Sequence, residues 1–132
     1  MSNKSDGNKF EQDYCMYLSK LGYYVIYNNG AAYSGEQPAD IVAIKNNFPI
    51  LIDCKLLENS TGRFPLSRIE ANQRLAFKRF KSCGNAVFLL AILWNNDLYY
   101  KDMENIDFNQ KSFSLKEMIP SIKDWRKYEN TN

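Results

Sequence analysis

Apolar side chains recur along the first part of the chain at the spacing of an amphipathic helix. The stripe consists of Phe10, Tyr14, Tyr17, Leu18 and Leu21. This spacing predicts a helix that begins at Ser5 or Asp6, where a short polar side chain can cap the first turn, and that ends at Gly22. Aromatic and β-branched residues over 23–27 then predict a strand.

Two further apolar runs, over 39–45 and 50–55, predict two more strands. The turn residues at 46–49, Asn-Asn-Phe-Pro, would join them as a hairpin. The second of these runs begins with three apolar residues, Ile50-Leu51-Ile52, which indicates a strand buried on both faces. The segment 28–38, with two glycines, is predicted to be a loop.

A second helix is predicted after a loop over 58–66. Ser67-Arg68-Ile69-Glu70 fits the capping box S-x-x-E, which would open a helix running to about Ser82, with Gly84 as its end. Strands are predicted over 86–93 and 98–101. A short helix is expected near Ser114, and the tail after Trp125 is expected to be weakly structured.

The predicted order is helix, three strands, helix, two strands, and the first six of these elements form an αβββαβ core. This order predicts an α/β fold with a mixed central β-sheet flanked by helices. A chain of 132 residues suits one domain. We therefore expect a single domain over 1–132, with an ordered core over about 6–119 and peripheral ends.

The composition excludes several classes of protein. No apolar run reaches the roughly 18 residues of a membrane span, and the polar N-terminus lacks the apolar stretch of a signal peptide, so a cytoplasmic protein is expected. The cysteines, Cys15, Cys54 and Cys83, are odd in number without a CxxC spacing, which predicts reduced thiols. The chain has no histidine. Histidine-based catalysis, Ser-His-Asp triads and Cys/His zinc sites are thereby excluded.

Positive charge is concentrated in one segment, although the net charge is only +2. Residues 63–81 contain six lysines or arginines and a single acid, Glu70. Such a basic segment can meet a phosphate backbone. A solvated helix face explains the same pattern equally well.

Acidic residues and one lysine converge in the predicted hairpin. Asp53 and Lys55 are two apart on a strand, so their side chains point to the same face. If the two strands pair through the turn at 46–49, Asp40 lies near Asp53. Two carboxylates so close repel each other unless a cation joins them, and Mg²⁺ prefers such oxygen ligands. The backbone carbonyl of Cys54 is a further candidate ligand.

Two polar residues on predicted helices fit the same site. Glu11 lies about 20° from Leu18 on a helical wheel at roughly 100° per residue, at the edge of the apolar stripe. Gln73 lies within the apolar stripe of the second helix, where a buried amide needs a partner. Taken singly, each of these residues has a structural interpretation, such as a surface ion pair or a solvated helix position. Their joint order favours a functional site.

This pattern resembles the PD-(D/E)xK nuclease superfamily. The stretches Pro38-Ala39-Asp40 to Ile44 and Ile50-Leu51-Ile52-Asp53-Cys54-Lys55 are similar to its core motif, and the thirteen-residue step from Asp40 to Asp53 is typical of cellular Holliday junction resolvases. Residues 22–55 resemble the archaeal Hjc resolvases. Arg63-Phe64-Pro65-Leu66, followed by Gln73, resembles the bacterial RecU resolvases. The resemblance spans most of residues 10–100 and implies a restriction-endonuclease-like core.

The resemblance implies roles for these residues. Asp40, Asp53, Glu11 and the Cys54 carbonyl would bind Mg²⁺, for which Mn²⁺ would substitute. Lys55 would be the catalytic lysine and Gln73 a supporting residue. DNA-backbone contacts are expected from Ser34, Arg63, Arg68 and Arg74.

The substrate implied is a four-way DNA junction, cut in recombination and repair by a homodimer that does not act at a membrane. Phe48, Tyr99 and Tyr100 are candidate interface residues. Two alternatives stay open: a restriction- or repair-type endonuclease acting on other DNA structures, and a non-catalytic nucleic-acid-binding module.

Overall fold

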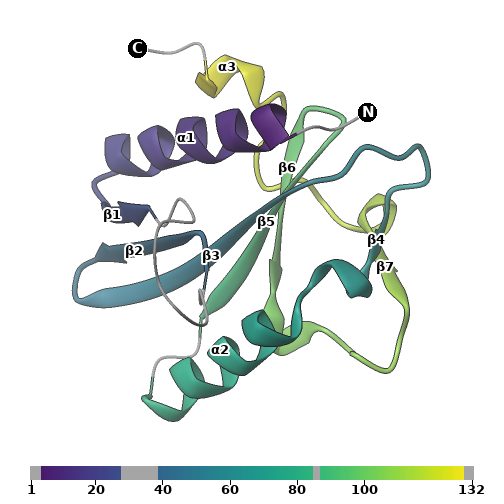
Figure 1. The fold of residues 1–132 in the computed structure, drawn as a ribbon. Helices are drawn as coiled ribbons and strands as arrows, with labels where there is room; N and C mark the ends of the chain where they lie inside the picture. The colour runs from purple at the N-terminus through teal and green to yellow at the C-terminus, as the bar shows by residue number, and fades with distance from the viewer. Residues whose placement is uncertain (1–3, 28–38, 85–86, 130–132) are drawn as a thin grey trace.

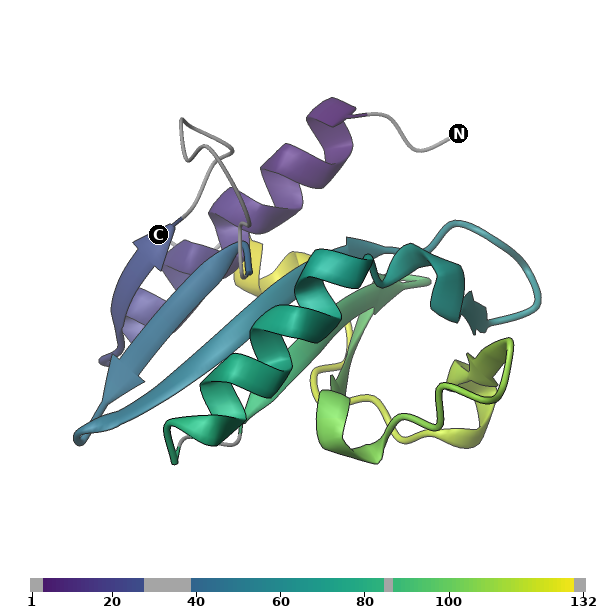
Figure 2. The same cartoon turned by 60° about the horizontal axis from the view of Figure 1, so that its bottom comes forward.

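A five-stranded mixed sheet forms the centre of the chain, and helices lie on both of its faces (Figures 1 and 2). The structure, a computed structural model, describes residues 4–27, 39–84 and 87–129. The strands of this sheet, in chain order, are β1 (Tyr24–Tyr27), β2 (Ile41–Lys45), β3 (Phe48–Leu56), β5 (Phe88–Trp94) and β6 (Asp97–Asp102). Their spatial order is β1-β2-β3-β5-β6, with β3 and β5 parallel and the other neighbours antiparallel.

The remaining elements cover the sheet or extend from it. The helices are α1 (Lys4–Lys20), α2 (Ala71–Ser82) and α3 (Arg126–Glu129), and the short 3-10 turns are η1 (Leu66–Arg68), η2 (Met103–Asn105) and η3 (Leu115–Glu117). A small second sheet pairs β4 (Arg63–Pro65) with β7 (Ser112–Ser114). Figure 2 shows α1 on one face of the central sheet and α2 on the other. The predicted fold class and the order of the main elements are confirmed.

Both hairpins of the central sheet close through a pair of asparagines. Asn46 and Asn47 have φ of 54° and 65°, and Asn95 and Asn96 have φ of 50° and 64°. Two-residue hairpin turns of this type need positive φ at both positions, which asparagine tolerates better than most residues. The first turn is therefore shorter than predicted, because Phe48 and Pro49 already belong to β3.

The second helix begins three residues later than its predicted capping box allows. Ser67 lies in η1, and Glu70 is the N-cap of α2. The side chain of Glu70 accepts a hydrogen bond from the backbone of Gln73, and the Gln73 side chain accepts one from the backbone N–H of Glu70. The capping box is thus formed by residues 70 and 73. At the other end of the chain, α1 begins at Lys4, so Ser5 and Asp6 lie inside the helix.

The loop predicted over 58–66 contains β4. The short helix predicted near Ser114 is the 3-10 helix η3, which has Ser114 as its N-cap and directly follows β7. The rings of Phe64 and Phe113 stack with centroids 5.3 Å apart across this small sheet. Local sequence does not reveal a pairing between segments about fifty residues apart, which explains why β4 and β7 were not predicted.

The C-terminal segment is part of the core. Trp125 is 1% exposed, and Ile122 is buried with it under α1. The rings of Phe10 and Tyr17 contact Trp125, and α3 follows it directly. The buried core therefore extends past residue 119, where the ordered core was predicted to end, and the short helix α3 follows Trp125 within the described residues.

Each face of the central sheet is covered by its own apolar cluster. The cluster on the α1 side includes Phe10, Tyr14 and Trp125, and the cluster on the α2 side includes Phe64, Phe88 and Trp94. Tyr99 is 5% exposed and packs near Trp94, and the hydroxyl of Tyr100 lies 2.5 Å from that of Tyr14. These two tyrosines were predicted as exposed interface residues, and that prediction was wrong. Phe48 is half exposed.

Among the helices that the structure describes, none has the length and apolar character needed to cross a membrane.

Candidate active site

Asp40 and Asp53 lie opposite each other where β2 begins and β3 approaches its end. Residues 41 and 52 are partners in the register, so continuing the pairing by one residue places 40 against 53. The backbone N–H of Asp40 donates to Oδ1 of Asp53 at 3.3 Å, and the N–H of Cys54 donates to Oδ2 of Asp40 at 3.0 Å. The predicted hairpin therefore brings the two acids together, and the β3 backbone fixes Asp40.

Asp53 is buried and is held by two side chains on the α2 side. It is 1% exposed, and its Oδ2 accepts from Nε2 of Gln73 at 2.6 Å. The ammonium of Lys55 lies 3.0 Å from the same oxygen and donates to the backbone carbonyl of Arg68 at 3.0 Å. A buried carboxylate needs such partners, since unpaired charge is strongly disfavoured away from water.

Gln73 connects the acid to the start of α2. Its side-chain oxygen accepts from the Glu70 N–H at 3.0 Å, while its side-chain NH₂ donates to Asp53. The cap therefore fixes which end of the amide faces the acid. The prediction that a buried Gln73 needs a polar partner is confirmed, because the residue is 8% exposed and bonded at both ends.

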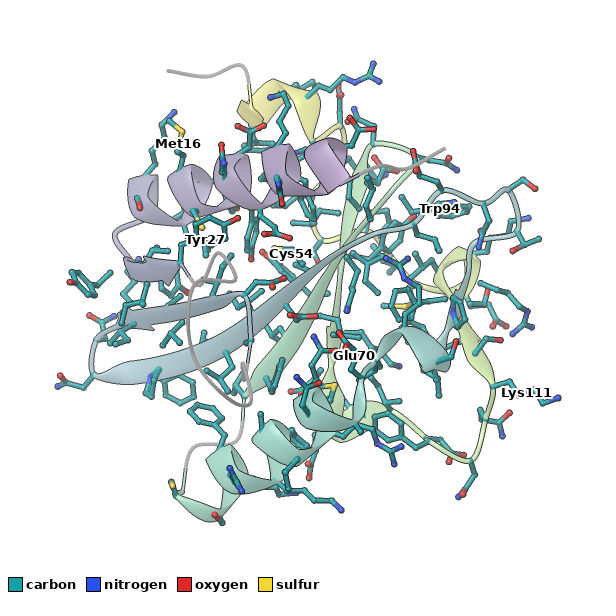
Figure 3. The ribbon with its side chains drawn as sticks, in the orientation of Figure 1. Met16, Tyr27, Cys54, Glu70, Trp94 and Lys111 are labelled. Atoms are coloured by element: carbon teal, nitrogen blue, oxygen red, sulfur yellow. The ribbon has the colours of Figure 1, made fainter. Side chains whose placement is uncertain are left out.

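Glu11 reaches the same region from α1. Its Oε1 accepts from the hydroxyl of Tyr27 at 2.7 Å. Partial burial raises the pKa of Glu11, the Tyr27 hydrogen bond opposes that shift, and the charge of Asp53 adds to it. Figure 3 shows Tyr27 next to α1, Cys54 on β3 and Glu70 at the start of α2, which bracket the site. Sequence reasoning missed Tyr27, which reads as an ordinary strand aromatic.

The electrostatics of Asp40 show that negative charge is concentrated here. Burial first, and then the charges of Asp53 and Glu11, together raise the pKa of Asp40 to about 8, although the N–H of Cys54 opposes the shift. A carboxyl group with such a pKa is largely protonated at neutral pH unless a cation is present. We call Glu11, Asp40 and Asp53 the acidic cluster.

The predicted DNA contacts lie farther out. Nη1 of Arg63 donates to the Ser112 hydroxyl at 3.2 Å. The guanidinium of Arg68 donates to the Leu56 carbonyl at 2.8 Å and lies over the Phe64 ring, so it supports the wall of the site. Arg74 lies over the ring of Phe108. Ser34 falls outside the described residues.

Comparisons with known proteins agree with this geometry. A family model of the archaeal Holliday junction resolvases (Hjc) matches residues 2–126. The solved structure of the Hjc resolvase of Archaeoglobus fulgidus has a TM-score of 0.63 and 21% identity to this chain, covering 92% of it and 99% of the archaeal protein. That likeness shows a shared fold. A search of curated protein sequences finds no match. Because the family match spans nearly the whole sequence, the chain belongs to the Hjc family of Holliday junction resolvases, which are structure-selective DNA endonucleases.

Proposed function

We propose that the acidic cluster and Lys55 form the hydrolytic centre of this resolvase, with Mg²⁺ as its cofactor. One observation carries the proposal: buried Asp53 faces Asp40 at one margin of the sheet while Lys55 lies 3.0 Å from its carboxylate. A surface ion pair would not require the burial of a second acid beside it. Resolvases of this family are metal-dependent nucleases, and this margin gathers the oxygen ligands for a metal.

The donor set suits Mg²⁺ best. In the described part of the chain no three Asp, Glu, Cys or His side chains form a metal-binding group by themselves. Mg²⁺ ordinarily binds through one or two carboxylates, keeps several waters and takes further oxygens from a phosphate. Asp40 and Asp53 supply such a pair, and the raised pKa of Asp40 indicates a position that lacks positive charge. Mn²⁺ accepts the same ligands and should substitute.

Two groups supplement the carboxylates. The Cys54 N–H points toward Asp40, and the N–H and C=O of a strand residue face the same side of the strand, so the Cys54 carbonyl suits a third oxygen ligand. Glu11 would orient a water molecule or a second ion. When bound, the metal would lower the pKa of its water and neutralise charge on the scissile phosphate.

Lys55 contributes a fixed positive charge. Its ammonium is held by the carboxylate of Asp53 and the carbonyl of Arg68. It therefore stands ready to stabilise the negative charge that develops on the phosphate oxygens, without reorganising during the reaction. Gln73 and Tyr27 are positioning residues, since they hold Asp53 and Glu11 by hydrogen bonds of 2.6 and 2.7 Å.

The substrate class constrains the assembly. A four-way junction has two-fold symmetry, and its resolution requires two matching cuts, so we propose a two-fold homodimer. Half-exposed Phe48 at the tip of the β2–β3 hairpin is a candidate contact for it. We place the enzyme in the cytoplasm, where its DNA substrate would be found.

The test is a cleavage assay on a synthetic four-way junction, with duplex and flap DNA as competitors, in the presence and absence of Mg²⁺. We expect paired, symmetric nicks in the junction by the wild-type chain, dependence on Mg²⁺ or Mn²⁺, and loss of cleavage with Lys55→Ala. Equal cleavage of all three substrates would favour a repair-type endonuclease. Full activity of Lys55→Ala would rule out the proposed centre.

A further inference from the structure

A groove with two cationic side chains lies between the start of α2 and the segment before β7. It has a volume of about 550 Å³, and its lining includes Leu66, Ser67, Ile69, Arg74, Phe108 and Lys111. No acidic side chain is among the described residues that line it. We call it the basic groove.

Residues that contact the candidate site are sequence neighbours of residues that line the basic groove. Arg68, whose carbonyl holds the ammonium of Lys55, lies between Ser67 and Ile69 of the groove wall. Arg74 follows Gln73, whose amide contacts Asp53. Consecutive helix residues point about 100° apart, so the first turn of α2 directs Gln73 to the acid and Arg74 to the groove.

The walls of the groove are tied together. The backbone N–H of Leu66 donates to the carbonyl of Lys111 at 2.9 Å, which places Lys111 next to the η1 wall. Across the groove, the guanidinium carbon of Arg74 lies 4.1 Å from the centre of the Phe108 ring. A guanidinium stacked on an aromatic ring keeps its N–H edges available to donate two hydrogen bonds to the oxygens of an anion such as phosphate.

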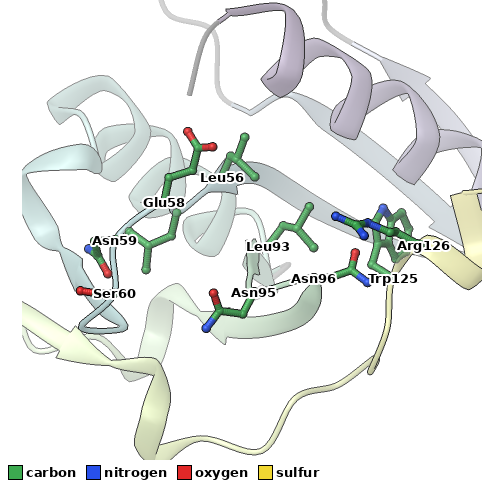
Figure 4. A pocket seen from close by; sticks show the side chains of 10 residues that line it. Leu56, Glu58, Asn59, Ser60, Leu93, Asn95, Asn96, Trp125 and Arg126 are labelled. Atoms are coloured by element: carbon green, nitrogen blue, oxygen red, sulfur yellow. The ribbon is translucent and has the colours of Figure 1, made fainter. Parts of the chain in front are cut away.

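A second cleft of similar size shows why charge matters. It has a volume of about 570 Å³ and is lined by Glu58, Asn95 and Arg126 among others (Figure 4). A carboxylate there would repel a phosphodiester. In the basic groove, Arg74 and Lys111 are both exposed, and neither forms a salt bridge within the described part of the chain. Their charge is therefore available to a ligand.

From this arrangement we propose that the basic groove binds the phosphodiester backbone of the substrate DNA strand next to the cleaved phosphate. Arg74, held on Phe108, and Lys111 would each contact a phosphate. This inference rests on the proposed function, because it takes DNA to be the ligand of the adjoining site. Contacts of this kind set the register of the strand over the acidic cluster without reading its sequence.

The test measures affinity for a fluorescein-labelled four-way junction by anisotropy in EDTA, where cleavage does not interfere. Arg74→Ala and Lys111→Ala should each raise Kd about fivefold to tenfold and lower the slope of log K against log salt by about 1. Arg126→Ala, at the mixed-charge cleft, is the matched control and should leave both quantities unchanged. Unchanged Kd and salt slope in Arg74→Ala and Lys111→Ala would overturn the proposal.

The role of the Phe108 ring is tested by a double-mutant cycle. Phe108→Leu should weaken binding in the wild-type background and have no further effect in Arg74→Ala. An equal loss in both backgrounds would contradict the positioning of Arg74 by the ring. Cleavage by the wild-type chain in Mg²⁺ tests the proposed function separately. If the wild-type chain cuts the junction but Arg74→Ala and Lys111→Ala bind it with unchanged Kd, only the proposal for the basic groove is contradicted.

Discussion

The α1 face of the sheet and the margin that carries the acidic cluster both bury polar groups, but they stabilise them differently. Under α1, the hydroxyls of Tyr14 and Tyr100 lie 2.5 Å apart and satisfy each other within an aromatic cluster. At the margin, Asp40 and Asp53 face each other as acids, and one charge opposes the other. Neutral partners of this kind stabilise a fold, whereas paired acids cost stability until a cation joins them. The first region therefore stabilises the fold, and the second is the hydrolytic centre that we propose.

The largest effect should come from the acid at the centre of the margin. Asp53→Asn keeps the size of the side chain but removes the charge that faces Lys55 and that would bind the proposed metal. We expect junction cleavage to fall about a thousandfold, which equals about 4 kcal/mol in the barrier. Single-turnover rates in Mg²⁺ measure this loss, and junction affinity in EDTA should be retained. A fall of less than about tenfold would show that Asp53 is not at the reacting centre.

The second effect tests the α1 face. Trp125 is almost completely buried and contacts the rings of Phe10 and Tyr17. Trp125→Ala should lower the free energy of unfolding by about 3 kcal/mol, measured by urea titration, because it leaves a large cavity. Trp125→Phe keeps a ring in place and should cost less than about 1.5 kcal/mol. If the two variants were equally stable, Trp125 would not be the anchor of the C-terminal segment.

The third substitution, Asp40→Asn, should raise the stability of the chain instead of lowering it. The pKa of Asp40 is raised to about 8 in the folded chain, from the usual value of about 3.9 for aspartic acid. The folded state therefore binds a proton more tightly than the unfolded state, so this group favours folding below about pH 4, and the benefit is lost as the pH rises toward 8. Without metal, Asp40→Asn should be more stable than wild type by on the order of 2 kcal/mol at pH 8.

Thermal unfolding of both chains between pH 4 and 8 measures this difference. The gain should shrink toward pH 4, because Asp40 is then protonated in the folded state and its ionisation in the unfolded state falls to about half. Mg²⁺ should raise the Tm of the wild type more than that of Asp40→Asn. A variant that is less stable than wild type at pH 8 in EDTA would contradict the predicted repulsion.

The smallest effect sharpens the comparison with a pair of matched substitutions. Tyr27→Phe removes the hydroxyl that holds Glu11, so we expect cleavage to fall about tenfold and the Mg²⁺ concentration for half-maximal cleavage to rise. Tyr14→Phe removes a buried hydroxyl on the α1 face and should leave cleavage unchanged while lowering stability by about 1 kcal/mol. Equal losses of cleavage in both variants would mean that Tyr27 acts only on the fold.

Sequence alone predicted the parts of the site that depend on strand periodicity. Asp53 and Lys55 share a face because strand side chains alternate, and Asp40 meets Asp53 because the hairpin register follows from a tight turn. Gln73 was recognised because an amide stood on an apolar stripe. The true capping box was missed, since Ser67 and Glu70 offered an equally good local pattern. Only the contact of Gln73 with both Glu70 and Asp53 distinguishes the two positions.

The sequence by itself determined the order of helices and strands, the absence of histidine chemistry and the acids that meet in one hairpin, because these follow from short-range spacing and composition. The tertiary structure decided the contact of Tyr27 with Glu11, the pairing of β4 with β7, the burial of Trp125 and the basic groove. Each of these joins segments that are distant in the chain. Such contacts depend on how the elements pack, and local spacing carries no information about them.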